Sequence, residues 1–150
     1  YVDLHYPLHL ADKVTDWSLN LYRSYVGHKP TYVVDGTGGL GGHSISYAQH
    51  SSVRKVFSIE IHQTRFKVSM KKAIFPQPLS NFVGPTSNVK ACRLDDKVQC
   101  IAGNFITWLK EQEANLLADS LVIIDPPWGG SDYKYESCIT DLYLENDQGK

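Results

Sequence analysis

The sequence has few cysteines, almost no net charge and no long apolar run. Its three cysteines are odd in number and lack Cys-x-x-Cys spacing, which argues against a disulfide framework or a zinc site and favours a reducing compartment. A formal net charge of -1 excludes a global basic field, so any contact with a nucleic acid must be local. No apolar run approaches the roughly 18 residues of a membrane span. The N-terminus lacks the charged-then-apolar order of a signal peptide. We therefore expect an intracellular protein, in the nucleus or cytoplasm, with no membrane partner.

The composition is that of a folded domain. Hydrophobic residues make up 42% of the 150 residues and charged residues 21%, which suits a globular chain that buries a core. The length is that of about one ordinary domain. An initiator Met is also missing, which suggests an excised domain. We expect a single domain over 1–150, with a helical segment at 1–30 and the core at 31–150.

Apolar spacing predicts strands and helices in alternation. Residues 5–26 have helical spacing and predict one or two amphipathic helices, with Trp17 on their apolar side. Short apolar runs predict strands at 31–35, 55–61, 97–105 (including the exit from the strand) and 120–125. Helices are expected at 43–50, 62–74 and 106–118, the last with Trp108 in the core, and an irregular loop at 75–88. This order predicts an α/β fold with a parallel sheet and right-handed crossovers.

Four polar or glycine-rich stretches follow the four predicted strands. They read "DGTGGLGG", "EIHQ", "AGNF" and "DPPWGG". Ligands of parallel α/β sheets bind beyond the carboxyl ends of the strands. The four stretches are therefore expected to converge on one binding edge. The six histidines of the chain are scattered without ligand spacing and predict no metal site.

The glycine-rich stretch matches a dinucleotide fingerprint, but its preceding acid argues for another ligand. Residues 36–41 fit G-x-G-x-x-G, and Glu60 follows at the distance that a dinucleotide site requires. Asp35, however, would repel a pyrophosphate and would suit a cationic amine and sulfonium. S-adenosylmethionine carries both groups. No Lys-Ser/Thr follows the glycines, which excludes a Walker loop. A plain tight turn remains a weaker reading, because five glycines within 36–42 exceed what a turn needs.

The second and third stretches offer contacts to a nucleoside. Glu60, at a strand end, could accept hydrogen bonds from both ribose hydroxyls of either ligand. Asn104 and Phe105 could contact the edge and face of an adenine. The same two residues could equally serve as a helix N-cap and a core aromatic, and the sequence leaves both readings open.

The fourth stretch is suited to an aromatic amine. Pro126 and Pro127 fix the backbone and remove amide donors, leaving the Asp125 carboxylate and the Pro126 carbonyl as rigid acceptors. Hydrogen bonds from the amine to these acceptors would orient its lone pair toward a methyl donor. Trp128 could stack on the base, worth about 1–3 kcal/mol, and Gly129 lets the backbone pass close to the ligand. A Pro-rich turn with a core Trp is the structural alternative.

Together these motifs resemble class I S-adenosylmethionine-dependent methyltransferases, and more narrowly the trimethylguanosine synthase family of RNA cap guanine-N2 methyltransferases. The likeness covers about residues 5–135, and its most specific part is P-P-W-G-G-x-D-Y at 126–133. The resemblance implies a Rossmann-like sheet with helices on both faces, a 7-methylguanosine cap as acceptor, capped RNA as partner and no metal. It implies cofactor contacts at Asp35, Gly36, Thr37, Gly38, Gly39, Glu60, Ile61, Asn104, Phe105 and Asp125. It also implies catalytic roles for Asp125, Pro126, Pro127 and Trp128, with Trp128 and Gly129 binding the base.

The chain departs from the family pattern in ways that keep alternatives open. Asp125 stands where family members often have Ser, and it keeps an adenine-N6 methyltransferase as an alternative. Asn104 stands where an Asp is usual. About three further strands are expected after 120–125, and the residues that follow are too few for them, so the sheet is expected to be incomplete at the C-terminus. A non-catalytic module that binds a cap or cofactor is the third hypothesis.

Overall fold

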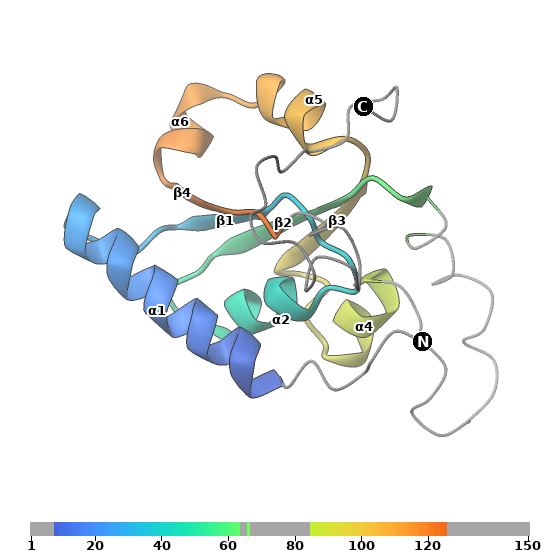
Figure 1. The fold of residues 1–150 in the computed structure, drawn as a ribbon, viewed down its shortest axis with the longest axis horizontal. Coiled ribbons are helices and arrows are strands. Elements are labelled where there is room, and N and C mark those ends of the chain that lie inside the picture. Colours follow the sequence, from blue (N-terminus) through green and yellow to red (C-terminus); the bar gives the residue numbers. More distant parts are fainter. Residues whose placement is uncertain (1–7, 64–65, 67–84, 126–150) are drawn as a thin grey trace, which may run out of the picture.

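Four parallel strands form the centre of the protein. The computed structural model describes residues 8–63, 66 and 85–125 (Figure 1). The strands pair in the order β3-β2-β1-β4, and every neighbouring pair is parallel. Their bounds are β1 Tyr32–Asp35, β2 Lys55–Glu60, β3 Val98–Ala102 and β4 Ser120–Ile123. This is the order of the first four strands of a Rossmann sheet. The expected α/β, Rossmann-like fold is thus confirmed.

The strand order reverses at β1. From β1 the chain moves outward through β2 to β3, then returns to pair β4 with the other side of β1. Asp35, the last residue of β1, pairs with Ser58 on one side and with Ile123 on the other. A reversal of this kind opens a crevice at the carboxyl end of the sheet, where α/β proteins bind ligands.

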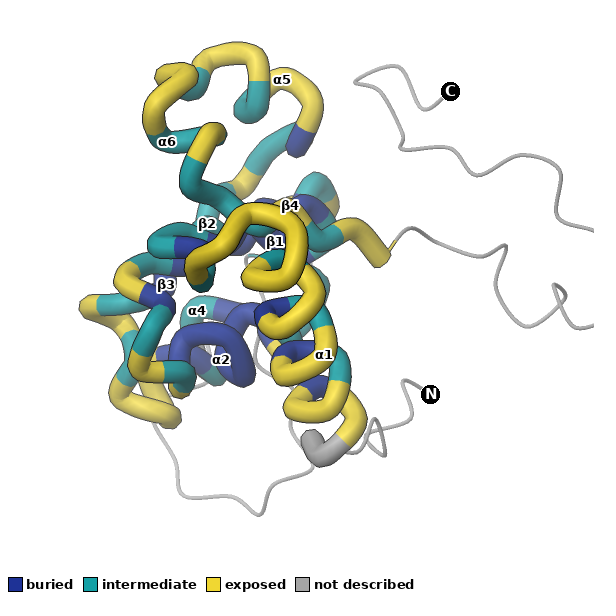
Figure 2. The backbone as a smooth tube through the Cα atoms, turned by 90° about the vertical axis from the view of Figure 1, so that its left-hand side faces the viewer, coloured by how far each residue is buried: buried dark blue, intermediate teal, exposed yellow. Residues whose placement is uncertain are grey.

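Helices cover both faces of the sheet (Figures 1 and 2). One face carries α1 (Leu8–Val26), α2 (Gly42–Gln49) and α4 (Pro85–Ala91), and the other carries α5 (Phe105–Lys110) and α6 (Ala114–Ala118). Because both faces are covered, Val33 and Val34, which point to opposite faces, are both fully buried.

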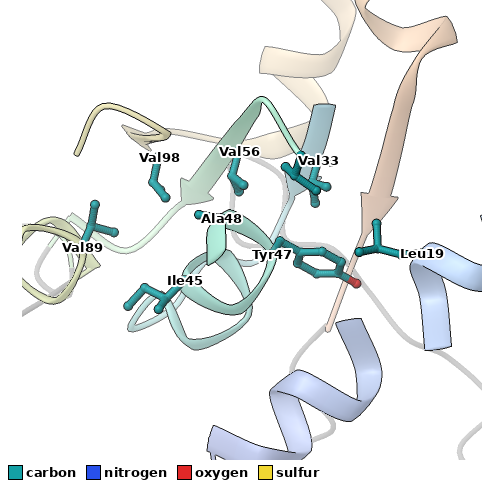
Figure 3. Close-up of a cluster of buried hydrophobic side chains, with 9 residues drawn as sticks. Leu19, Val33, Ile45, Tyr47, Ala48, Val56, Val89 and Val98 are labelled. Atoms are coloured by element: carbon teal, nitrogen blue, oxygen red, sulfur yellow. The ribbon is translucent and has the colours of Figure 1, made fainter. Parts of the chain in front are cut away.

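Two apolar clusters fill the space between the sheet and the helices. The larger lies under α1, α2 and α4, where the ring of Tyr47 lies between the strands and Leu19 (Figure 3). The smaller cluster lies on the opposite face and consists of Val34, Ile59 and Phe105. Burial of these side chains provides the main drive for folding.

The described part of the N-terminal segment contains one helix, α1, and it packs through a face that the sequence did not indicate. Ala11, Thr15 and Leu19 are buried, whereas Trp17 is 66% exposed. Polar contacts decide the orientation: Thr15 Oγ1 donates to Ser46 Oγ at 2.9 Å, across the contact with α2. The prediction that Trp17 belongs to the core is therefore wrong. Within the described part of the chain, neither this helix nor any other is long and apolar enough to cross a membrane.

Two further expectations need correction. Residues 85–91 form α4, whereas a loop was expected over 75–88; a proline at the first helical position is compatible with a helix start. The single helix expected over 106–118 is two helices, because the polar residues 111–113 interrupt the apolar pattern. Most of the helix expected over 62–74, and residues 75–84, lie outside the described residues.

The orientation of α1 yields a stability prediction. Leu19→Ala should destabilise the protein by about 2–5 kcal/mol, because it leaves a cavity in the larger cluster. Trp17→Ala should change the free energy of unfolding by no more than about 0.5 kcal/mol, because that side chain is on the surface. Urea denaturation of both variants measures the difference. A larger loss for Trp17→Ala would show that α1 packs through its other face.

Candidate functional site

The carboxyl ends of the four strands bring the candidate residues to one edge. Asp35 ends β1 and Glu60 ends β2. Asn104 follows β3, and Asp125 follows β4. The convergence expected from the sequence is therefore present for these stretches. Pro126, Pro127, Trp128 and Gly129 lie outside the described residues.

The glycine loop after β1, residues 36–41, is hydrogen-bonded to the end of β4 and to the residues that follow it. The backbone N–H of Gly36 donates to the carbonyl of Ile123 at 2.9 Å. One step further, the N–H of Asp125 donates to Thr37 Oγ1 at 2.7 Å. The start of the Asp-Pro-Pro-Trp motif is thus fixed next to the glycine loop, although 88 residues separate Thr37 from Asp125 in the sequence.

Asp35 is a buried carboxylate at the carboxyl end of β1. It is 3% exposed. Ser44 Oγ donates to its Oδ2 at 2.6 Å, and the N–H of Thr37 donates to its Oδ1 at 3.3 Å. Burial raises the pKa of Asp35 above its usual value. The hydrogen bond from Ser44, the proximity of His43 and the bond from Thr37 oppose this rise, whereas Asp125 adds to it.

Glu60, at the end of the neighbouring strand β2, is hydrogen-bonded to the glycine loop. Its carboxylate is 4% exposed. Oε2 accepts a hydrogen bond from the N–H of Gly39 at 2.8 Å, and Oε1 accepts one from the N–H of His62 at 2.7 Å. Ile61, between Glu60 and His62 in the sequence, is half-buried. The Glu60 side chain therefore fixes both the glycine loop and the backbone that leaves β2.

The glycines allow the loop to lie directly on β2. A Cβ atom at Gly38 would collide with Ser58 Oγ and would lie 3.1 Å from the carbonyl oxygen of Ile59. The N–H of Gly38 donates to that same carbonyl at 2.7 Å. Gly41, with φ of 87°, is the N-cap of α2 in a conformation that other residues rarely adopt.

Asn104 and Phe105 take structural positions at the third strand. Asn104 is the N-cap of α5, and its Oδ1 accepts a hydrogen bond from the N–H of Thr107 at 3.1 Å. The ring of Phe105 is 6% exposed and packs with Val34 and Ile59. A Cβ at Gly36 would lie 2.8 Å from this ring, so Phe105 supports the loop from below.

Sequence reasoning missed two hydroxyl groups beneath the loop. Ser44, in α2, and Ser58, in β2, are 0% and 1% exposed, and their Oγ atoms lie 2.8 Å apart. Small hydroxyl residues in buried positions of a helix and a strand were the only available signal, and it is a weak one.

The chemistry of this edge suits a cation better than a pyrophosphate. Two buried carboxylates, Asp35 and Glu60, flank the glycine loop, and no Lys or Arg is among the residues that bond to either in the described part of the chain. A pyrophosphate would meet negative charge here, whereas an amine, a sulfonium or a ribose hydroxyl would meet acceptors. Within the same described ranges, no group of three or more His, Cys, Asp or Glu could hold a metal ion.

A reversed parallel sheet with an acid-led glycine loop at its switch point is the arrangement of a class I methyltransferase. A family model described as RNA cap guanine-N2 methyltransferase matches residues 30–146. The chain belongs to this family. Among solved structures, it is similar to a protein of Klebsiella pneumoniae assigned as an O-methyltransferase, with 12% identity and a TM-score of 0.48 over 89% of this chain and 67% of that one. No curated protein matches the chain.

The burial of Asp35 yields a pH-dependent prediction. Because its pKa is raised in the folded protein, the stability that Asp35 contributes is full below its unfolded-state pKa and is lost as the pH rises through its folded-state pKa. Asp35→Asn should therefore raise the melting temperature of the ligand-free protein by a few degrees at neutral pH. The gain should shrink as the pH falls and wild-type Asp35 becomes protonated. Thermal denaturation at a series of pH values measures this. A constant difference, or a loss of stability at neutral pH, would contradict the assignment.

The close contact of Gly38 with β2 yields a second prediction. Gly38→Ala should destabilise the protein by about 1–3 kcal/mol, because the new methyl group overlaps Ser58 and crowds the strand backbone. Gly42→Ala is the matched control, because its Cβ would meet nothing within 4 Å. At the first turn of α2 it should be neutral or stabilise by up to about 1 kcal/mol. Chemical denaturation compares the two, and equal effects would mean that the loop does not rest on β2.

Proposed function

We propose that this protein transfers a methyl group from S-adenosylmethionine to the exocyclic N2 amine of a 7-methylguanosine RNA cap. Membership of the cap guanine-N2 methyltransferase family supports this proposal. The observation that carries the proposal is the hydrogen bond between Asp125 and Thr37. This bond joins the start of the motif suited to an aromatic amine to the glycine loop suited to a cationic cofactor.

The cofactor would lie along the carboxyl ends of β1, β2 and β3. The acidic end of β1 and the loop residues Gly36, Thr37, Gly38 and Gly39 would hold its methionine part, with Asp35 facing the cationic groups. Glu60 would accept hydrogen bonds from the ribose in place of the bond from Gly39, and Ile61 would lie beside it. Asn104, with the neighbouring Phe105, would border the adenine.

The target base would lie at the end of β4. Bound S-adenosylmethionine supplies an electrophilic methyl group on a sulfonium. Asp125 and the Pro126 carbonyl would accept hydrogen bonds from the N2 amine and hold its lone pair toward that methyl group. Trp128 would stack on the 7-methylguanine, whose positive charge adds about 1–2 kcal/mol of cation–π attraction in a desolvated site. Asp125 would then receive the proton that the amine releases, directly or through water.

A methyl-transfer assay tests the proposal. The protein is incubated with S-adenosylmethionine and either 7-methylguanosine triphosphate, unmethylated GTP or adenosine, and the acceptors are analysed by mass spectrometry. We expect a methyl mass gain on the 7-methylguanosine acceptor alone. Trp128→Ala should abolish turnover and largely spare cofactor binding, because stacking on the base is lost while the glycine loop is intact.

Trp17→Ala is the matched control, since it removes a surface indole from α1. It should retain wild-type turnover. Methylation of adenosine would instead favour an adenine-N6 methyltransferase, the alternative that Asp125 keeps open. Cofactor binding without any transfer would favour a non-catalytic binding module. Normal turnover by Trp128→Ala would contradict the placement of the base.

A further inference from the structure

Behind Asp35 lies a short chain of buried hydroxyl groups that the proposed reaction does not use. Ser44 Oγ is 2.6 Å from Asp35 Oδ2, and Ser58 Oγ is 2.8 Å from Ser44 Oγ. All three side chains are at most 3% exposed. They come from three different elements, namely β1, α2 and β2. Their alignment therefore depends on the packing of the helix against the sheet.

The charge of the carboxylate fixes the direction of these hydrogen bonds. One hydroxyl group carries one proton, so Ser44 cannot donate to Asp35 and to Ser58 at the same time. Ser44 Oγ has donor geometry toward both Asp35 Oδ2 and Ser58 Oγ, so the two bonds are alternatives. When Asp35 is ionised, Ser44 donates to the carboxylate. A hydrogen bond to a charged acceptor is stronger than one between neutral groups, which favours the bond to Asp35 over the bond to Ser58.

We propose that Ser44 is a positioning residue that holds the Asp35 carboxylate toward the cationic groups of the cofactor. This inference rests on the proposed function. Asp35 is buried at the end of a strand and would not keep its charge without donors, because burial disfavours the ionised form. The hydrogen bond from Ser44 is the largest of the influences that lower the pKa of Asp35.

Other titratable groups near Asp35 contribute less or act in the opposite direction. His43 lowers its pKa more weakly than Ser44 does, and Asp125 raises it. The remaining groups coupled to Asp35 are Tyr47 on α2 and Cys100 on β3, and burial raises the pKa of both. Glu60 has its carboxylate bonded to backbone N–H groups on the other side of the loop.

Ser44 can be tested against a second buried serine, two residues further along the same helix. Ser46 is also buried, but it donates to Asp12 and accepts from Thr15 instead of contacting Asp35. Ser44→Ala, Ser44→Thr and Ser46→Ala are compared with wild type in the affinity for S-adenosylmethionine, by titration calorimetry over a pH series. In parallel, the Asp35 carboxyl carbon of the ligand-free protein is titrated by NMR.

We expect Ser44→Ala to weaken cofactor binding by about tenfold or more at neutral pH, as for the loss of a hydrogen bond to a charged group. The pH midpoint of binding and the NMR titration of Asp35 should both move to higher pH. Ser44→Thr should return both midpoints toward wild type, whatever its effect on stability. Ser46→Ala should lower the melting temperature and leave both midpoints unchanged.

Two results would overturn the inference. One is an Asp35 midpoint in Ser44→Ala equal to that of wild type. The other is an equal shift in Ser46→Ala, which would mean that any weakening of α2 has the same effect. If wild type fails to bind S-adenosylmethionine at any pH, the proposed function is wrong. The NMR titration of the ligand-free protein then still decides whether Ser44 holds the charge of Asp35.

Discussion

The burial of a carboxylate at the end of the central strand is the constraint on which the rest of the site depends. Asp35 must end β1, because only there do α2, β2 and the loop all reach it. An ionised group in this position is unfavourable unless donors surround it. Ser44 and Thr37 are such donors, and each lies at a position set by the turn from β1 into α2. The positions of α2, the glycine loop and the end of β1 therefore depend on one another.

The glycines make this arrangement sterically possible. Gly38 lies against β2 with no room for a side chain, and Gly36 lies over the ring of Phe105. Three hydrogen bonds then hold the loop between two strands: one to Glu60 at the end of β2, one to Ile123 in β4, and one from Asp125, just after β4, to Thr37. A loop fixed in this way is preorganised, so little conformational entropy remains to be lost when a ligand binds.

The sequence was sufficient where apolar runs and glycines determine the structure, and insufficient where one residue type serves two purposes. The four strands and their shared edge follow from apolar runs that end in an acid or a glycine. The packing face of α1 could not be foreseen, because Thr15 is held by polar contacts while Trp17 remains exposed. Asn104 and Phe105 could not be assigned, since an N-cap and a core ring use the same residues as a nucleoside contact. The contact of Ser44 with Asp35 could not be foreseen from the sequence, because the two residues are close only after α2 packs on the sheet.

We propose that the glycine loop, with Asp35 directly before it, selects a cationic cofactor over a pyrophosphate, although its sequence matches a dinucleotide fingerprint. The most direct measurement is titration calorimetry of the intact chain with S-adenosylmethionine, S-adenosylhomocysteine and NAD in separate experiments. We expect the first two to bind and NAD not to bind, because the pyrophosphate of NAD would face Asp35. Binding of NAD with no binding of S-adenosylmethionine would contradict the account.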